Sequence, residues 1–336
     1  MSNKKFFPIV LTLIIFILGC SGQTQKTKEI DVRVGLIGLT MEFLKNTPPQ
    51  RIFEGDKFPV VIKVKNAGAA YIKDKQGVLS LAFEKDYTKS VELLQSGNVQ
   101  PFPESNIKNT AVFDLEGRTK INQKGGEEVI SYNLVSGRVD PQSEFHSSTV
   151  IATLCYPYET ILDSTVCIDT DISNLRPGKK VCKLQDLAFA NGQGAPVAIS
   201  KIEVQMLPSQ DSGKITPQFL IYVENKGTGI VIKNDAVKEF CTQGKVSSDK
   251  FNTITVKAFF PGTGLGEELD CEPKEKGNKE KQGYVKLKDK KDIIRCAFKE
   301  GIQNNQDPFL KPLRIDMTYG YTQSISASYL TQKTAR

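Results

Sequence analysis

Two stretches of this sequence, VVIKVKNAGAAYI at residues 60–72 and FLIYVENKGTGIV at residues 219–231, follow one pattern. Apolar side chains occupy alternate positions in both, which is typical of a β-strand with one buried face. Each run then ends in Asn-x-Gly, which begins at Asn66 in the first stretch and at Asn225 in the second, an offset of 159 residues. The pattern predicts two equivalent strands, each followed by a turn.

A second pair of matching stretches lies near the ends of the two halves. LCYPYET at residues 154–160 aligns with MTYGYTQ at residues 317–323, an offset of 163 residues. Two nearly equal offsets at distant points of the chain favour a duplicated domain, although chance similarity among strands also produces short matches. The aligned tyrosines are Tyr156 with Tyr319 and Tyr158 with Tyr321.

The rest of the sequence is also typical of an all-β protein. Runs of β-branched and aromatic residues are separated by turn residues, and the only modest helix candidate is NDAVKEFC at residues 234–241. Each half has about 140 residues, enough to bury a core, so we expect an all-β fold of two tandem immunoglobulin-like β-sandwich domains. The expected strands are 58–68, 77–86, 127–135, 148–158 and 164–169, and the expected domains are residues 31–170 and 197–336, joined by a linker at 171–196.

The beginning of the chain resembles a secretory signal. A short region with two lysines precedes an apolar run that ends in Ile-Leu-Gly-Cys at residues 17–20. This ending resembles the lipobox of prokaryotic lipoproteins, which implies a signal peptide at residues 1–19, lipid attachment at Cys20 and a flexible tether at residues 20–30. The alternative is an uncleaved transmembrane anchor, for which the run is short, since a span needs about 20 residues. Either interpretation places the remaining chain outside the cell membrane, on its extracellular or extracytoplasmic side.

The other cysteines fit an exported protein. Six remain besides Cys20, and an even number in an exported chain predicts disulfides, whereas no Cys-x-x-Cys occurs that would favour a zinc or iron–sulfur site. The stretch CYPYETILDSTVCID at residues 155–169 has its midpoint at Ile161, and a hairpin there would place Cys155 opposite Cys167. We therefore predict a disulfide between these two residues. The disulfide candidates are Cys155, Cys167, Cys182, Cys241, Cys271 and Cys296.

Few residues suggest chemistry. The single histidine, His146, is the base that a hydrolase would use, but its neighbours on a strand point to opposite faces and do not form a prebuilt triad. Carboxylates in DSTVCIDTD, residues 163–171, are candidates for calcium, yet the spacing of an EF-hand is absent. We predict no catalytic residue, no metal and no cofactor. The aligned tyrosines have two interpretations. They form an aromatic platform for carbohydrate or, with more support, they are strand residues whose rings pack on one face. These residues are Tyr156, Tyr158, Tyr319 and Tyr321.

The stretch VVIKVKNAGAAYI resembles the second strand of the CARDB-type immunoglobulin-like domains of bacterial and archaeal surface proteins, in which an alternating strand ends in Asn-x-Gly. INQKGGEEVISYNLV at residues 121–135 is similar to a later segment of that family, where a Gly-Glu pair precedes an alternating strand. The resemblance implies a seven-stranded sandwich used for adhesion, spacing or assembly, with no catalytic residues to carry over. The chain departs from the family pattern in its cysteines and its long inserts.

These observations together predict a non-enzymatic protein anchored in the cell membrane by an N-terminal lipid or helix. Its sandwiches would serve adhesion, envelope assembly or partner binding, and its partner would be another surface protein or an envelope polymer. Nucleic acid is not expected, because the formal net charge of +7 comes without a basic stripe interleaved with aromatic residues. The alternatives are a module that binds envelope polysaccharide or a small ligand, and a hydrolase that uses His146.

Overall fold

The two repeated stretches form strands β3 (Lys57–Asn66) and β12 (Lys214–Asn225). Every second side chain of β12 is buried from Ile215 to Asn225, and β3 is buried at the equivalent positions, ending in Asn66. The alternation that the sequence predicts is therefore confirmed in both strands. Each strand places one apolar face toward a core and the other toward solvent.

The computed structural model describes residues 31–103, 108–176, 179–211, 213–262 and 266–334. Contacts divide the chain after Asp31, and all elements named below belong to the unit Val32–Arg336. The predicted signal peptide (1–19), the lipid attachment at Cys20 and the tether (20–30) lie outside the described residues.

Three sheets, almost entirely antiparallel, contain most of the described chain, as expected for a β-sandwich protein. The first has the order β1 (Leu39–Phe43), β3, β8 (Glu127–Ser136) and β5 (Thr88–Leu94). The second has the order β10 (Leu187–Ala188), β11 (Val197–Pro208), β12, β18 (Lys291–Ala297) and β16 (Asp270–Glu272), with β19 (Ile302–Gln303) beside β12. The third has the order β15 (Glu267–Glu268), β14 (Thr253–Phe260), β20 (Phe309–Gln332), β9 (Phe145–Ile168), β4 (Ile72–Ala82), β7 (Thr110–Leu115) and β6 (Gln100–Pro101), with β13 (Ile230–Ile232), β17 (Gly283–Lys286) and β2 (Arg51–Phe53) paired at its sides.

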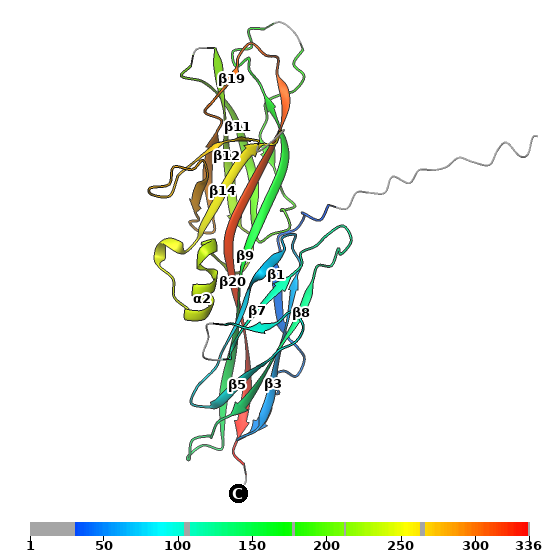
Figure 1. Cartoon of the computed structure of the whole chain (residues 1–336), viewed down its shortest axis with the longest axis vertical. Helices are drawn as coiled ribbons and strands as arrows, with labels where there is room; N and C mark the ends of the chain where they lie inside the picture. Colours follow the sequence, from blue (N-terminus) through cyan, green and yellow to red (C-terminus); the bar gives the residue numbers. More distant parts are fainter. Residues whose placement is uncertain (1–30, 104–107, 177–178, 212, 263–265, 335–336) are drawn as a thin grey trace, which may run out of the picture. The chain divides into compact units, whose positions relative to one another are not determined.

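The two long strands β9 and β20, each of 24 residues, run antiparallel beside each other in the third sheet (Figure 1). Every residue is paired, from Phe145 with Gln332 to Ile168 with Phe309. The N-terminal part of β9 also pairs with β4, and the N-terminal part of β20 pairs with β14. The ladder therefore joins strands of the first half of the chain to strands of the second half.

This continuous ladder corrects one expectation from the sequence. The stretches 148–158 and 164–169 are parts of one strand, and the chain does not turn at Ile161. The physical reason is that β20 supplies a partner for every residue between them, so the backbone needs no hairpin to complete its hydrogen bonds. The expected linker at 171–196 begins after β9 ends, and it contains β10, which pairs with β11.

The third sheet packs face to face against the other two. The rings of Phe58 on β3 and Tyr329 on β20 lie 4.9 Å apart between centroids, and those of Phe219 on β12 and Phe260 on β14 lie 5.9 Å apart. Burial of such a side chain stabilises the fold by about 1.5–3 kcal/mol. The largest fully buried side chains are Tyr132, Tyr156, Tyr319, Tyr321, Phe58, Phe113, Phe219 and Phe260.

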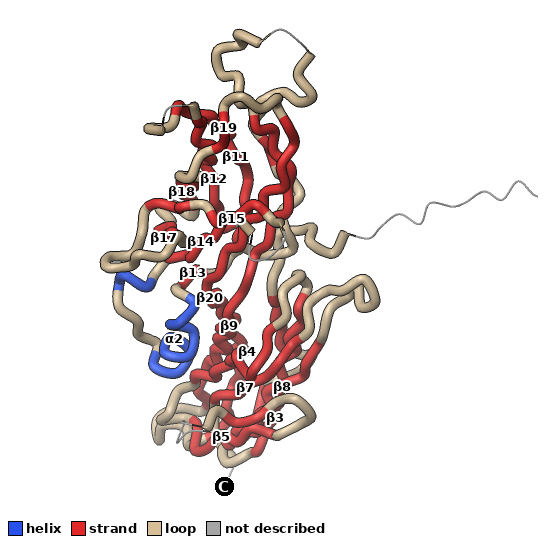
Figure 2. Tube along the Cα trace, turned by 45° about the horizontal axis from the view of Figure 1, so that its top comes forward, coloured by secondary structure: helices blue, strands red, loops and turns tan. Residues whose placement is uncertain are grey.

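The predicted helix is confirmed as a 3₁₀ turn, Asn234–Ala236, followed by α2 (Val237–Gln243). This helix contacts β9, β4 and β20 (Figure 2). Gly320 on β20 allows the close approach, because a Cβ atom there would lie 2.5 Å from Cγ2 of Val237. The helix ends at Gly244, whose φ of 66° suits the left-handed conformation of a C-terminal cap.

Candidate functional site at the end of β9

The four tyrosines come together where β9 and β20 cross the middle of the third sheet. Tyr156 is paired with Tyr321, and Tyr158 is paired with Tyr319. At most 3% of each residue's surface is exposed, so the rings are core residues and do not form a platform that a sugar can reach. Burial raises the pKa of Tyr156 and of Tyr319 well above the usual 10, which keeps both hydroxyls neutral.

The tyrosine hydroxyls belong to a network that occurs in both halves of the chain. The hydroxyl of Tyr158 donates to Oδ1 of Asn66 over 3.1 Å, and that of Tyr321 donates to Oδ1 of Asn225 over 3.3 Å. Each of these Oδ1 atoms also accepts the backbone N–H two residues later in the Asn-x-Gly turn, over 3.1 Å. The repeated motifs are therefore structural: each asparagine connects the end of one strand to the core face of another.

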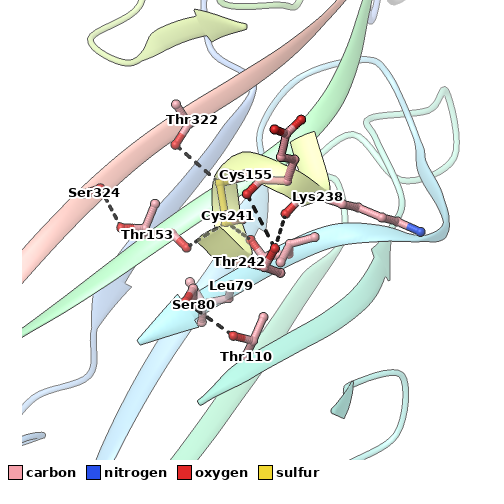
Figure 3. Close-up of a disulfide and its surroundings, with 12 residues drawn as sticks. Leu79, Ser80, Thr110, Thr153, Cys155, Lys238, Cys241, Thr242, Thr322 and Ser324 are labelled. Atoms are coloured by element: carbon pink, nitrogen blue, oxygen red, sulfur yellow. Dashed lines mark hydrogen bonds between the residues drawn. A yellow bond between two sulfur atoms is a disulfide. The ribbon is translucent and has the colours of Figure 1, made fainter. Parts of the chain in front are cut away.

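The disulfide pairing differs from the sequence prediction. Cys155 bonds to Cys241 and not to Cys167, because Cys155 and Cys167 lie twelve residues apart on one extended strand, about 40 Å along its axis. Figure 3 shows the bond between β9 and α2, with the hydroxyl of Thr322 lying 3.5 Å from Sγ of Cys155. Adjacent strand residues face opposite sides, so Tyr156 enters the core while Cys155 holds α2 on the other face.

The remaining cysteines form two further disulfides. Cys271 on β16 bonds to Cys296, its register partner on β18. Cys167, near the end of β9, bonds to Cys182 in the connection toward β11. This second bond ties the connection to the end of the long strand, where the surface is hollowed.

The hollow beside Cys182 has a volume of about 650 Å³. It lies at the end of β9, and its lining exposes apolar side chains: Val181 is 76% exposed and Ile172 is 45% exposed. Nearby Leu175 is 83% exposed. Exposed apolar side chains within a polar rim are typical of a surface that binds a partner. The residues lining the hollow are Asp169, Ile172, Asn174, Lys180, Val181, Cys182, Lys183, Leu184 and Met206.

The carboxylates considered for calcium are held by the chain itself. Asp169 lies 2.6 Å from Nζ of Lys180. The carboxylate of Asp171 accepts the backbone N–H groups of Arg176 and Leu175, and these hydrogen bonds hold the pKa of Asp171 below its usual range. Within the described part of the chain, no group of three or more His, Cys, Asp or Glu side chains is close enough to hold a metal ion.

His146 lies near the opposite end of β9, about 70 Å from Cys167 along the strand. Its Nε2 is 2.9 Å from a carboxylate oxygen of Glu84, and its ring stacks on Tyr87 with 3.4 Å between centroids. Both contacts fix the imidazole at the surface of the first half. These contacts join the beginning of β9 to the connection between β4 and β5. The hydrolase alternative gains no support from them.

The exposed apolar residues in and near the hollow were not found from the sequence. Val181 and Leu175 lie in a linker rich in glycine and proline, where single apolar residues follow no period. The one sequence signal that points to this region is Cys182, because a disulfide in a linker fixes the conformation of the loop around it. Among the described residues, no helix has the length and apolar character to cross a membrane.

Comparison with protein families finds no match, and no curated protein matches the chain. Similar solved structures include the C-terminal domain of the Streptococcus pyogenes antigen I/II-family protein AspA, with 6% identity, 89% of this chain and 100% of that chain covered and a TM-score of 0.19. A partial N-terminal region of enterococcal surface protein has 8% identity, coverage of 88% and 86% and a TM-score of 0.20. The secreted serine protease VesC from Vibrio cholerae has 9% identity and a TM-score of 0.20; the match covers 84% of this chain and 50% of VesC. Scores this low assign neither fold nor function.

Proposed function

We propose that this chain is a non-enzymatic cell-surface protein, held at the membrane through Cys20, that presents two immunoglobulin-like halves for adhesion, envelope assembly or partner binding. The observation that carries the proposal is the ladder between β9 and β20, which crosses from one half to the other. Bending at the junction would break backbone hydrogen bonds of this ladder. A stiff junction suits a protein that has to hold a binding surface away from its anchor.

The three disulfides support the external location. All six cysteines after Cys20 are bonded, and disulfides persist in oxidising compartments outside the cytoplasm. Two of the disulfides attach other segments to β9, one at the middle of the strand and one near its end.

The hollow at the end of β9 is our candidate for the presented surface. Its apolar side chains would contact an apolar patch of another surface protein, and Lys180 and Lys183 would form part of a polar rim. An envelope polysaccharide or a small ligand is the second candidate. The volume of the hollow favours it, because ligand sites usually measure about 300–1,000 Å³.

Anchoring is tested by replacing Cys20 with serine. The variant should move from the membrane fraction to the soluble fraction, and mass analysis of the wild-type N-terminus should find lipid on Cys20. Retention of the serine variant in the membrane would contradict lipid anchoring and would favour an uncleaved helix.

Partner binding is tested by cross-linking on intact cells, followed by purification. A Val181→Asp, Leu175→Asp variant should lose a protein that the wild type captures, because charge at these two exposed apolar positions in and near the hollow opposes apolar contact. The matched control is Ile121→Asp in the first half, where the side chain is 99% exposed and outside the hollow. Equal capture by all three chains would exclude the hollow as the contact, and glycan-array binding lost only in the first variant would favour the polysaccharide candidate.

A further inference from the structure

A lysine, an asparagine and an aspartate meet at the edge of the third sheet, far from the hollow in sequence. Nζ of Lys75 lies 2.5 Å from Oδ1 of Asn98 and 3.2 Å from Oδ2 of Asp114. All three residues are partly buried, with 30% of the Lys75 side chain and 21% of the Asp114 side chain exposed. An amine therefore lies next to a side-chain amide, with a carboxylate in contact to move a proton.

The backbone around Lys75 holds its side chain in this position. The pairing of β4 with β7 is interrupted between Ile72 and Gly77, so the intervening residues bulge out of the strand. Within the bulge, Asp74 and Lys75 have φ values of 56° and 54°, a conformation that side chains other than glycine rarely adopt. The backbone N–H of Lys75 donates to Oδ1 of Asp114 over 2.6 Å, so one carboxylate holds both ends of the lysine.

The amide of Asn98 is held as well. Its Nδ2 donates to the backbone carbonyl of Asp114 over 2.9 Å, while its own backbone carbonyl accepts from Nζ of Lys75 over 2.9 Å. The amide plane is therefore fixed with its oxygen toward the amine and its nitrogen toward β7. Fixing two reacting groups in contact removes much of the entropic part of a barrier.

From this geometry we infer that Lys75 and Asn98 join in an intramolecular isopeptide bond. Asp114 accepts a proton from the Lys75 ammonium, and the neutral Nζ then attacks Cγ of Asn98 and forms the N–C bond. Asp114 transfers protons to Nδ2 as the bond between Cγ and Nδ2 breaks. One ammonium ion leaves, Asp114 is again a carboxylate, and the step needs no oxidant, cofactor or water.

The bond would fasten β4 to the turn before β6 at a sheet edge, beside Asp114 on β7, in the half whose cysteines bond to residues later in the chain. This inference is independent of the proposed surface function. A second lysine offers an internal comparison: Nζ of Lys180 lies 2.6 Å from Oδ1 of Asn174 and 2.6 Å from Oδ2 of Asp169. Asn174 is exposed, and among the described residues its amide has a hydrogen bond to Lys180 alone, so we expect this pair to stay unlinked.

The test is a tryptic map of the purified full chain by mass spectrometry. The expected product is a branched peptide in which Asp74–Lys85 is joined to Ser90–Lys108 with the loss of one ammonia and without cleavage after Lys75. Succinimide formation at Asn191–Gly192 also releases ammonia, so the branch and not the intact mass decides the result.

Two variants complete the test. Lys75→Arg keeps the positive charge and its hydrogen bonds but should give no branched peptide, and Asp114→Asn should reduce the linked fraction at least tenfold because the proton acceptor is lost. Linear peptides containing unmodified Lys75 and Asn98 in the wild type would overturn the inference. A branch between Lys180 and Asn174 alone would overturn it as well.

Discussion

The two halves of the chain share one buried network and differ in their covalent links. Asn66 with Tyr158 in the first half and Asn225 with Tyr321 in the second make the same hydrogen bonds. The disulfide Cys271–Cys296 closes within the second half, whereas Cys155 and Cys167 bond to cysteines later in the chain. The comparison teaches that the buried polar network is the same in both halves, whereas the disulfides differ: one joins the two halves, one ties the connection to the end of β9, and one closes within the second half.

The largest effect is expected from the disulfide that crosses the halves. Replacing Cys155 and Cys241 with alanine opens a loop of 86 residues and should lower the free energy of unfolding by about 4–5 kcal/mol in the chain-entropy model. The matched pair, Cys271 and Cys296, closes 25 residues and should contribute about 3.5 kcal/mol. Urea unfolding followed by circular dichroism measures both, and a larger loss for the second pair would contradict this ranking.

The two Asn-x-Gly turns should differ in how they tolerate a methyl group. A Cβ at Gly68 would lie 2.0 Å from the Tyr158 hydroxyl and 2.5 Å from the backbone oxygen of Gly194, which cannot rotate away. At Gly227 the contact is 2.1 Å from the Tyr321 hydroxyl, and the other near atoms belong to side chains. Gly68→Ala should therefore lower the unfolding free energy by about 3 kcal/mol and Gly227→Ala by about 1–2 kcal/mol.

Thermal unfolding compares the two glycine variants, with Gly262→Ala as control because a Cβ there meets no atom of the described residues within 4 Å. Equal losses at both turns would show that backbone contact at Gly68 adds nothing beyond the tyrosine.

Replacing the asparagine should also cost more stability in the first half than in the second. The amide of Asn66 donates to the carbonyls of Ala70 and Leu115, whereas that of Asn225 donates to the carbonyl of Gly229. Asn66→Ala leaves more buried groups unpaired, so it should cost about 2 kcal/mol against about 1 kcal/mol for Asn225→Ala. Chemical denaturation checks the order, and a costlier change at Asn225 would reverse it.

The smallest effect concerns a carboxylate that the second half lacks. Partial burial, and then the charge of Asp316, raise the pKa of Glu159 above its usual 4.5, although Arg314 opposes this. The aligned residue of the second half is Thr322. Because the folded pKa is raised, ionised Glu159 costs stability above that pKa, and the cost disappears as the pH falls toward 4.5.

Glu159→Gln should therefore stabilise the protein at pH 7 by less than about 1 kcal/mol, since solvent screens a partly exposed group. Melting temperatures measured from pH 4 to pH 8 test this, and a stabilisation that persists unchanged at pH 4 would contradict the assigned cause.

Local sequence predicted the strands but not their partners. The alternating residues of β3 and β12 indicated their buried faces correctly, and NDAVKEFC indicated α2. The hairpin at Ile161 was wrong because it was placed at the midpoint between Cys155 and Cys167, whereas the residues just after that point, Asp163 and Ser164, continue β9. Their partners, Arg314 and Leu313, lie about 150 residues later in the chain, and a local pattern contains no information about them.

The contacts that form the candidate sites were likewise not predictable from local sequence. Cysteine count predicted disulfides, but pairing depended on α2 lying across β9, which places Cys241 beside Cys155. Lys75, Asn98 and Asp114 are ordinary polar residues in the sequence, and only the bulge in β4 brings them into contact.

By itself, the sequence determined the repeated strand-and-turn pattern and the buried face of each of the two strands, because period-two alternation and the Asn-x-Gly turn are local properties of the chain. Tertiary structure alone decided that the halves share a sheet, which cysteines bond and which tyrosines are buried. Those outcomes depend on contacts between segments far apart in the chain, and such contacts are set by the packing of whole sheets and not by any short stretch of residues.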